Sequence, residues 1–228
     1  MLKVSDNRKV LAEFVGSCIL VIASVGSYTK FTVVMENTSN MALLGNAIAV
    51  AFILAALIEM LGPISSAHFN PIVTMISYID KTISKGLAIK YIIVQFMGGI
   101  VGVIITHLMF HDYLGYILRI ATRERNGFIY FGEFIASFIL LLCILFLVKV
   151  KSDKTSLMIG LLVGGNIMAT SSTNFANPQV TLARVFTDAP SGIRPFDAIV
   201  FILMQIVAAL LAYALYKFMF KGEKENES

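Results

Sequence analysis

Long apolar runs alternate with short polar segments along most of the chain. Six of the runs are long, and they cover residues 10–29, 41–61, 87–110, 128–149, 156–173 and 196–220. A helix of about 20 apolar residues crosses the roughly 30 Å of hydrocarbon in a bilayer. The pattern therefore predicts an all-α membrane protein with six transmembrane helices, of which the fifth is short and interrupted by glycines.

Two further apolar stretches are too short to cross a bilayer. They lie near residues 69–79 and 176–187 and are each only about ten residues long. Ten residues make about 15 Å of helix, which is half of a membrane. Because both stretches are also too apolar for ordinary loops, we expect them to form re-entrant half-helices, which enter the membrane and turn back.

The composition favours a bilayer as the solvent of this chain. Hydrophobic residues make up 57% of the 228 positions and charged residues 14%, whereas soluble domains carry about 25% charged and 45–50% apolar residues. The net charge of +4 is small and scattered, so no nucleic-acid partner is expected. Cys18 and Cys143 lie inside apolar runs, where the role of a small buried hydrophobe is expected.

The two halves of the chain resemble each other. The segment AEFVGSCILVIAS (12–24) aligns with GEFIASFILLLCI (132–144), and SAHFNPIVT (66–74) resembles TNFANPQVT (173–181). Each half contributes three spans, an odd number, so the second copy must cross the membrane in the inverted sense. Inverted repeats that each contain a broken helical element indicate a transport path at their interface.

This organisation predicts a single channel domain over residues 1–221. Repeat one covers about 8–110, repeat two covers about 127–220, and residues 222–228 form a polar tail. The side of the membrane that holds both termini collects twelve of the Lys and Arg residues, and the other side has six. Because positively charged loops stay in the cytoplasm, we expect a multi-pass protein of the plasma membrane with both termini and the tail in the cytoplasm.

An Asn-Pro pair stands at the start of each predicted half-helix. Asn is a favoured N-cap and Pro a favoured first helical residue, so Asn70-Pro71 and Asn177-Pro178 predict two helix starts. If the half-helices enter from opposite faces, their positive dipole ends meet near the middle of the bilayer. Each Asn side-chain oxygen can cap its own helix, which leaves the amide N–H groups facing the lumen.

A pore centre of this kind presents hydrogen-bond donors only. A water molecule must turn its oxygen toward Asn70 and Asn177, so it cannot pass a proton along the file, and the dipole ends oppose cations. A plain helix start in a loop explains one such pair. It does not explain two pairs that share an apolar half-helix and a threonine four residues after Asn, at Thr74 and Thr181. The pairs therefore predict a narrow path for neutral, hydrogen-bonding solutes.

These motifs resemble those of the aquaporins, the major intrinsic protein family. The resemblance rests on AEF and GEF at the start of the repeats, on GPISSAHFNPIVT and on NFANPQVTLAR, and it extends over nearly the whole chain. It implies six tilted helices plus two half-helices, with a pore through each subunit of a homotetramer. It also implies that Glu13 and Glu133 brace the irregular loop backbones. The alternative for both is a carboxylate at the membrane edge, although a buried charge in a span is usually paired or functional.

The sequence departs from the family pattern directly after each Asn-Pro pair. The family has Ala in these positions, where it lets the two half-helices touch closely. Here the residues are Ile72 and Gln179. A bulkier Ile and a polar Gln leave the spacing of Asn70 and Asn177 open.

The predicted selectivity constriction lacks the usual charge. Many family members carry a pore-facing Arg three residues after the second signature Asn, and here that position is Val180. Ungapped counting from the motifs places the other constriction residues at Val50, Gly165 and Asn174, with Asn166 as the alternative to Gly165. The set contains no aromatic and no charged residue, which predicts a wider and more apolar filter than that of a strict water channel.

Two further residues lie next to the signature motifs. Arg184 comes seven residues after Asn177, about 10 Å further along the half-helix, which places it in the outer vestibule. Our first interpretation is a pair with Asp188, one turn on, and the second is a side chain that folds back over the pore mouth. His68 is expected to line the cytoplasmic half of the pore, with a packed histidine as the alternative.

Together these features predict a passive channel for small neutral solutes that excludes ions and protons. The resemblance to bacterial and archaeal members that lack the usual filter Arg suggests water, glycerol-like polyols and metalloid acids such as arsenite as solutes. No enzymatic activity, metal or cofactor is expected. Two alternatives remain. An ion-coupled secondary transporter needs titratable groups at the midplane that the sequence does not show, and a structural membrane protein would have no significant flux.

Overall fold

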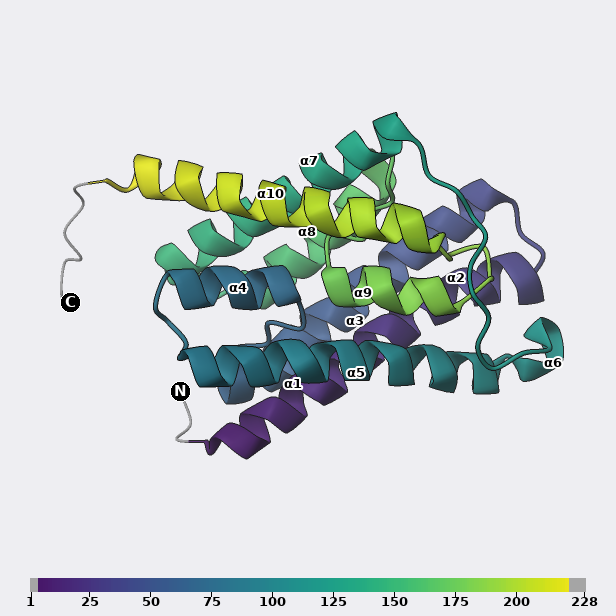
Figure 1. Ribbon diagram of the computed structural model, residues 1–228, viewed down its shortest axis with the longest axis horizontal. Helices are drawn as coiled ribbons and strands as arrows, with labels where there is room; N and C mark the ends of the chain where they lie inside the picture. Colours follow the sequence, from purple (N-terminus) through teal and green to yellow (C-terminus); the bar gives the residue numbers. More distant parts are fainter. Residues whose placement is uncertain (1–3, 222–228) are drawn as a thin grey trace.

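The computed structural model of the chain describes residues 4–221, which form helices and loops without a β-strand (Figure 1). The first span is a continuous helical rod of 29 residues, Asp6–Val34. It consists of α1 (Asp6–Val21), a π-helical turn (Ile22–Gly26), α2 (Ser27–Thr29) and a second π-helical turn (Lys30–Val34). The rod therefore extends beyond the predicted 10–29 at both ends. The polar tail predicted at 222–228 lies outside the described residues.

The other long helices confirm the predicted spans. They are α3 (Ser39–Ser65), α5 (Lys85–Met109), α7 (Gly127–Lys149), α8 (Thr155–Ala169) and α10 (Pro195–Met219), and a short α6 (His111–Leu114) follows α5. Within residues 4–221, five helical segments are long and apolar enough to cross a membrane, and α8 is shorter, with 15 residues. This short helix is the predicted fifth span. It ends at Ala169 rather than at residue 173, because the backbone becomes extended at Thr170.

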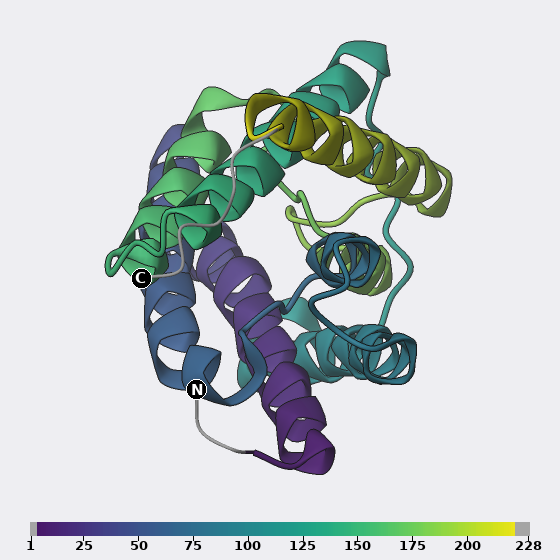
Figure 2. The ribbon, with the colours of Figure 1, turned by 90° about the vertical axis from the view of Figure 1, so that its left-hand side faces the viewer.

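The two short helices at the centre begin at the Asn-Pro pairs. α4 (Pro71–Ile79) and α9 (Pro178–Ala183), which continues as a 3₁₀ turn (Arg184–Phe186), confirm the predicted half-helices. In Figure 1 they lie end to end between the long helices, and in the perpendicular view of Figure 2 they overlap along one line. Their N-terminal ends meet in the middle of the bundle, so the two half-helices enter it from opposite sides.

Glycines let the long helices approach each other closely. α5 packs against α1, and α8 packs against α3. A Cβ atom on Gly102 of α5 would lie 2.6 Å from the carbonyl oxygen of Cys18, and a Cβ atom on Gly160 of α8 would lie 2.5 Å from that of Ala51. Since a real Cβ atom cannot approach an oxygen so closely, only glycine allows these backbones to touch.

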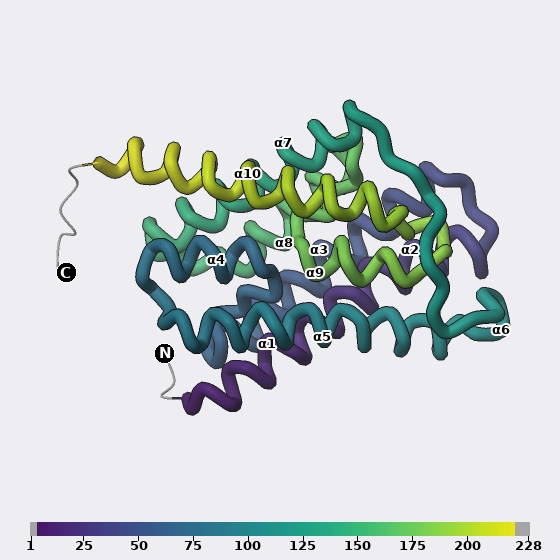
Figure 3. The backbone as a smooth tube through the Cα atoms, viewed as in Figure 1, coloured from purple at the N-terminus to yellow at the C-terminus, as the bar shows by residue number. Residues whose placement is uncertain are grey.

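α1 begins and α10 ends at the same end of the bundle, which we call the terminal side (Figures 1 and 3). In Figure 3 an extended segment, residues 115–126, runs across the opposite side from α6 to α7. Its backbone bonds to the chain that follows α9. The N–H of Arg119 donates to Phe186 O at 3.1 Å, and the N–H of Ala121 donates to Val185 O at 2.8 Å. Segment 115–126, which connects the two repeats, therefore holds the end of the second half-helix in place.

Candidate transport pore

Each half-helix begins at an Asn whose side chain caps it. Asn70 Oδ1 accepts a hydrogen bond of 3.1 Å from the backbone N–H of Ile72. Asn177 Oδ1 accepts a bond of the same length from the N–H of Gln179. Pro71 and Pro178 occupy the first helical positions, where a missing N–H removes no helical bond. Both helix starts are therefore specified by local sequence.

The two Asn side chains also connect the repeats to each other. Asn70 Nδ2 donates to the carbonyl of Ala176, and Asn177 Nδ2 donates to the carbonyl of Phe69, both at 2.8 Å. A side-chain amide has two N–H groups, so each Asn keeps one N–H for the lumen instead of both. The paired bonds hold the N-terminal ends of the half-helices together.

The backbone before each Asn adopts an unusual conformation. Residues with positive φ that are not glycine are Ser66, Ala67 and Phe69 in the first loop and Thr173, Asn174 and Ala176 in the second. The two sets occupy equivalent positions in the repeats. Such conformations cost about 1–3 kcal/mol per ordinary residue, and they persist only where the surroundings hold them.

The carboxylate of Glu13 holds the first loop. Glu13 is fully buried on α1 and accepts hydrogen bonds from the N–H groups of His68 at 2.9 Å and Phe69 at 2.7 Å. It also accepts a bond of 2.7 Å from the Ser65 hydroxyl and one of 2.8 Å from the Gln95 amide. Four donors satisfy this buried group and tie α1, α3 and α5 to the loop.

The carboxylate of Glu133 holds the second loop in the same way. It is fully buried on α7 and accepts hydrogen bonds from the N–H groups of Phe175 at 3.2 Å and Ala176 at 2.5 Å. The side-chain amide of Gln205 on α10 donates a third bond, of 2.6 Å. The two repeats therefore resemble each other in the side chains that support their loops, because Glu133 holds the second loop as Glu13 holds the first.

Gln95 and Gln205 complete these networks, although no sequence motif pointed to them. Gln95 also donates to Thr74 Oγ1 at 3.0 Å, and Gln205 donates to Thr181 Oγ1 at 2.8 Å. Each Gln thus links a supporting Glu to its half-helix. The available signal was a lone amide in the middle of an apolar span, in YIIVQFMGG and in FILMQIVAA. A buried polar side chain in such a position usually has a partner.

One elongated cavity of about 790 Å³ passes both Asn residues. It extends from Lys9 and Thr82 on the terminal side to Phe175 and Arg184 on the opposite side. The long helices contribute an apolar wall made of Leu20, Val50, Leu54, Leu140, Ile144, Ile159, Val163 and Ile167. Among residues 4–221, no three or more His, Cys, Asp or Glu side chains are grouped so that they could hold a metal ion. The cavity thus combines an apolar wall with a line of polar loop groups.

Comparisons with known proteins identify the family of this chain. A family model described as major intrinsic protein matches residues 1–176. The chain belongs to the major intrinsic protein family. Among its relatives, aquaglyceroporin AqpS of Rhizobium meliloti is 34% identical over 214 residues, which are 93% of this chain and 90% of that protein.

A more distant relative and a solved structure agree with this family. The probable aquaporin TIP3-2 of Oryza sativa subsp. japonica is 28% identical over 226 residues, which are 96% of this chain and 84% of that protein. The X-ray structure of the aquaglyceroporin from Plasmodium falciparum matches with a TM-score of 0.71 at 18% identity and covers 96% of both chains. This match shows that the two proteins share the fold of the major intrinsic proteins.

Three of the four residues expected at the constriction line the cavity of this family member. They are Val50 of α3, Asn174 of the second loop and Val180 of α9. Val50 and Val180 are 4% and 5% exposed. These residues contribute two valine side chains and one side-chain amide to the cavity wall.

The fourth expected residue, Gly165, does not reach the cavity, and neither does its alternative, Asn166. The cavity wall from α8 includes Val163 and Ile167 instead. Asn166 donates to the carbonyl of Ala136 at 3.3 Å and so packs toward α7. Ungapped counting was wrong here because the rotation of α8 is set by its glycine contacts with α3.

The residues that replace the usual alanines point away from the cavity. Ile72 and Gln179 are 1% and 0% exposed, and neither belongs to the cavity wall. Gln179 Nε2 donates to Phe69 O at 3.3 Å, and Gln179 Oε1 lies 2.4 Å from the point where a Cβ atom on Gly99 would be. The missing side chain of Gly99 makes room for Gln179, so the extra volume lies between α9 and α5 rather than in the lumen.

Arg184 folds back toward the cavity instead of pairing with Asp188. Its guanidinium carbon lies 4.1 Å from the centroid of the Phe175 ring, and the residue lines the cavity and is 7% exposed. Within the described residues, the carboxylate of Asp188 is bound by Arg119 at 3.5 Å and by the N–H and hydroxyl of Thr122 at 3.0 Å. The expected Arg184–Asp188 pair is therefore wrong, because Arg119 and Thr122 of segment 115–126 occupy that carboxylate.

His68 lines the half of the cavity nearer the terminal side and is also packed there. Its Nδ1 lies 3.0 Å from Thr74 Oγ1, and its Nε2 lies 3.4 Å from Ser77 Oγ. The ring meets that of Tyr91 edge-on, with centroids 5.5 Å apart. His68 therefore both lines the cavity and packs against neighbouring side chains.

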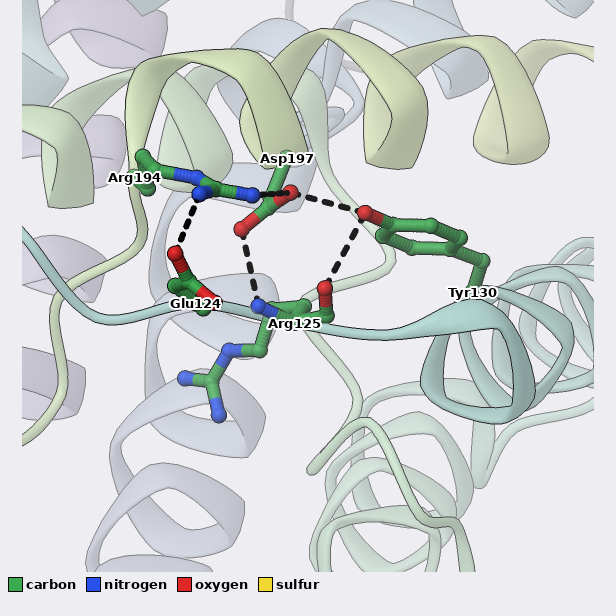
Figure 4. Close-up of polar contacts among 5 residues, drawn as sticks. All are labelled: Glu124, Arg125, Tyr130, Arg194 and Asp197. Atoms are coloured by element: carbon green, nitrogen blue, oxygen red, sulfur yellow. Dashed lines mark hydrogen bonds and ion pairs between the residues drawn. The ribbon is translucent and has the colours of Figure 1, made fainter.

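A polar cluster anchors the end of segment 115–126 to the start of α10 (Figure 4). The fully buried Asp197 accepts hydrogen bonds from the N–H of Arg125 at 2.8 Å and from the hydroxyl of Tyr130 at 2.7 Å. Arg194 binds both Asp197, at 3.1 Å, and Glu124. In Figure 4 the guanidinium of Arg125 points away from Asp197. The cluster therefore fixes the backbone of Arg125 without neutralising its side chain.

Proposed function

We propose that this protein is a passive channel that lets water and small neutral solutes cross a membrane down their gradients. The observation that carries the proposal is the cavity that passes both capped half-helix ends, where Asn70 and Asn177 each keep one amide N–H. A water molecule at this point must turn its oxygen toward both donors, which interrupts proton transfer, and the positive dipole ends oppose cations.

We infer that the solutes include glycerol-like polyols and small metalloid acids such as arsenous acid, besides water. Val50 and Val180 offer apolar contact to the carbon side of a polyol, and Asn174 offers a donor and an acceptor to its hydroxyl groups. The names of the Rhizobium relative, an aquaglyceroporin, and of the rice relative, a probable aquaporin, support this class of solute.

We further propose a homotetramer in the plasma membrane, with a pore in each subunit and both termini in the cytoplasm. The excess of Lys and Arg residues on the terminal side, twelve against six, supports this orientation. Large apolar side chains such as Phe52, Phe131 and Ile199 are 60% or more exposed on the outer helices and require lipid or a neighbouring subunit.

The test is stopped-flow light scattering on proteoliposomes, with water, glycerol and arsenous acid as the permeating species. We expect each to cross faster than in protein-free vesicles. Val180→Arg adds a long cation to the cavity wall, so it should lower glycerol and arsenous acid permeability more than water permeability. Val150→Arg is the matched control, because Val150 is 63% exposed at the end of α7 and outside the cavity wall.

Two results would contradict the proposal. A flux no greater than that of bare lipid would favour a structural role. Accumulation of a solute against its gradient under an imposed pH difference would favour an ion-coupled transporter. If the Val180→Arg and Val150→Arg variants behave alike, the constriction does not include Val180.

A further inference from the structure

Arg184 supplies a positive charge to the cavity from a position that the family pattern does not use. It is 7% exposed, it lines the cavity, and its Nε atom is buried without a hydrogen-bond partner. Among residues 4–221, no carboxylate forms an ion pair with it. The charge of this guanidinium at the cavity is therefore not cancelled by a carboxylate partner within the described residues.

Phe175 gives this guanidinium a fixed platform. The backbone N–H of Phe175 is held by Glu133, and its ring meets Phe201 edge-on with centroids 5.2 Å apart. The ring is 4% exposed, and the guanidinium of Arg184 lies over it. A flat cation over an aromatic face is a favourable and oriented contact. The charge is therefore positioned by stacking rather than by a neutralising salt bridge.

A second arginine approaches the same ring. The guanidinium carbon of Arg125 lies 5.7 Å from the centroid of Phe175, and Arg125 Nε is also buried without a partner. Arg125 donates through Nη2 to the carbonyl of Gly192 at 3.2 Å, a neutral acceptor. Glu133 is the carboxylate that holds the second loop, and it already accepts hydrogen bonds from Phe175, Ala176 and Gln205. The charge at this end of the cavity is thus predominantly positive.

Val180 and Arg184 lie four residues apart on the half-helix and its 3₁₀ turn, and both line the cavity. We infer that this channel divides its selectivity between them. Arg184, seated on Phe175, excludes cations, and Val180, with Val50, sets the width available to a solute. This inference rests on the proposed function and goes beyond it, because it assigns charge exclusion and size selection to different residues.

The physical reason is that charge and width act on different properties of the solute. A unit charge in the low-dielectric wall of a narrow pore raises the barrier for any cation, whatever its size. Valine methyl groups carry no charge and exclude only by volume. A solute without charge meets in Arg184 a donor for its oxygens, so removal of the guanidinium should affect cations and neutral polyols in opposite or unequal ways.

The experiment compares two readouts in proteoliposomes that contain the full chain. The first is methylammonium permeability relative to glycerol, and the second is the fall in permeability along the polyols glycerol, erythritol and xylitol. The variants are Arg184→Gln, Arg184→Lys and Val180→Phe. Arg123→Gln is the matched control, because it removes an exposed arginine of segment 115–126 on the same side.

We expect Arg184→Gln to raise the methylammonium-to-glycerol ratio by about tenfold or more, because a full charge is lost from the wall. Arg123→Gln should stay within about twofold of the unmodified protein. Arg184→Lys keeps the charge but loses the planar group that stacks on Phe175, so its ratio should lie between those of the unmodified protein and Arg184→Gln. Val180→Phe should move the polyol cut-off toward glycerol and should not raise the methylammonium permeability itself.

The inference is overturned if Arg184→Gln leaves the methylammonium ratio unchanged, or if Val180→Phe raises the methylammonium permeability itself. Should Arg184→Gln fail to reconstitute, Phe175→Leu takes its place, since it keeps both arginines but removes their platform. A methylammonium ratio in Phe175→Leu equal to that of the unmodified protein then overturns the inference. The proposed function fails separately, if the unmodified protein passes glycerol no faster than bare lipid does.

Discussion

The side-chain amide of Asn70 donates a hydrogen bond of 2.8 Å to the carbonyl of Ala176, the residue directly before Asn177. Asn177 returns an equivalent bond to the carbonyl of Phe69, the residue directly before Asn70. Each Asn therefore caps its own half-helix, holds the other loop and still has one N–H for the lumen. Residues of both repeats therefore form this pair of amide donors, which neither repeat could build alone.

Asn177→Asp should make the centre permeable to protons or cations. The new carboxylate can still accept the capping bond from the N–H of Gln179. Its second oxygen replaces the Nδ2 group that donated to the carbonyl of Phe69, so a negative acceptor stands in place of a neutral donor. We expect a proton or sodium leak on the order of tenfold above that of the unmodified protein, because a negative charge at the midplane attracts cations. A pH-sensitive dye inside proteoliposomes measures the leak. Asn126→Asp, at the exposed start of α7, is the control, and equal leaks in both variants would count against this assignment of the centre.

Glu133→Gln should destabilise the second loop. The two carboxylate oxygens of Glu133 accept from Ala176 and Phe175, and Gln205 donates to one of them, so an amide NH₂ in place of either oxygen faces a donor. Loss of a hydrogen bond to a buried charged group costs about 1.5–3 kcal/mol. Thermal unfolding in detergent should show a clearly lowered Tm. Glu59→Gln, whose carboxylate binds Ser156 at the exposed surface, should leave Tm nearly unchanged, and a drop of equal size there would contradict the explanation.

Gly164→Ala and Gly165→Ala form a matched pair of neighbouring substitutions in α8. A Cβ atom on Gly164 would lie 2.8 Å from Ala51 Cβ and 3.0 Å from Ala47 O, whereas a Cβ atom on Gly165 would meet no atom within 4 Å. Gly164→Ala should therefore lower Tm and loosen the contact between α3 and α8. Gly165→Ala should raise the free energy of unfolding by up to about 1 kcal/mol, because Ala favours a helix more than Gly does. It should also leave glycerol flux unchanged, and a change in flux would return Gly165 to the cavity wall.

Asp80→Asn should reduce stability only where Asp80 is ionised. Burial raises the pKa of Asp80, but hydrogen bonds from Lys217 and Tyr213 and the charges of Lys217 and Lys149 outweigh this, so its pKa lies below the ordinary value. A carboxyl whose pKa is lowered by folding stabilises the protein above its unfolded pKa of about 4, and this stabilisation disappears as the pH falls through the folded pKa.

The measurement is the difference in Tm between the unmodified protein and Asp80→Asn at about pH 7 and about pH 3. The side chains of Asp80 and Lys217 are 25% and 53% exposed, so the pair should contribute no more than about 1 kcal/mol at neutral pH. The difference should shrink toward low pH. A difference that grows as the pH falls would have the wrong sign for this pair.

Much of the fold was predictable because its signals are local. A helix that crosses a bilayer must be apolar over its length, so hydropathy located the six spans. An Asn side chain caps the helix that follows it, and a Pro fits the first turn, so the starts of α4 and α9 at Pro71 and Pro178 could be read directly. The repeat pattern added the inversion, because three spans reverse the direction of the chain.

The direction in which individual side chains point was harder to predict. Counting along the sequence offered Gly165 or Asn166 as the pore residue of α8, whereas the cavity wall includes Val163 and Ile167. The difference is the rotation of α8 about its axis. That rotation is set by Gly160 and Gly164 against α3, which is a contact between repeats. The same holds for Gln179, whose bulk is accommodated by Gly99 on another helix.

The sequence by itself determined the six spans, the two half-helices and their caps, since each depends on residues close together in the chain. Only the tertiary structure decided where Arg184 points. Its sequence neighbour Asp188 is bound by Arg119 and Thr122 of segment 115–126, and Phe175, held by Glu133, offers the guanidinium an aromatic face beside the cavity. A long, flexible side chain follows the partners that remain available after the helices have packed, and those partners come from distant parts of the chain.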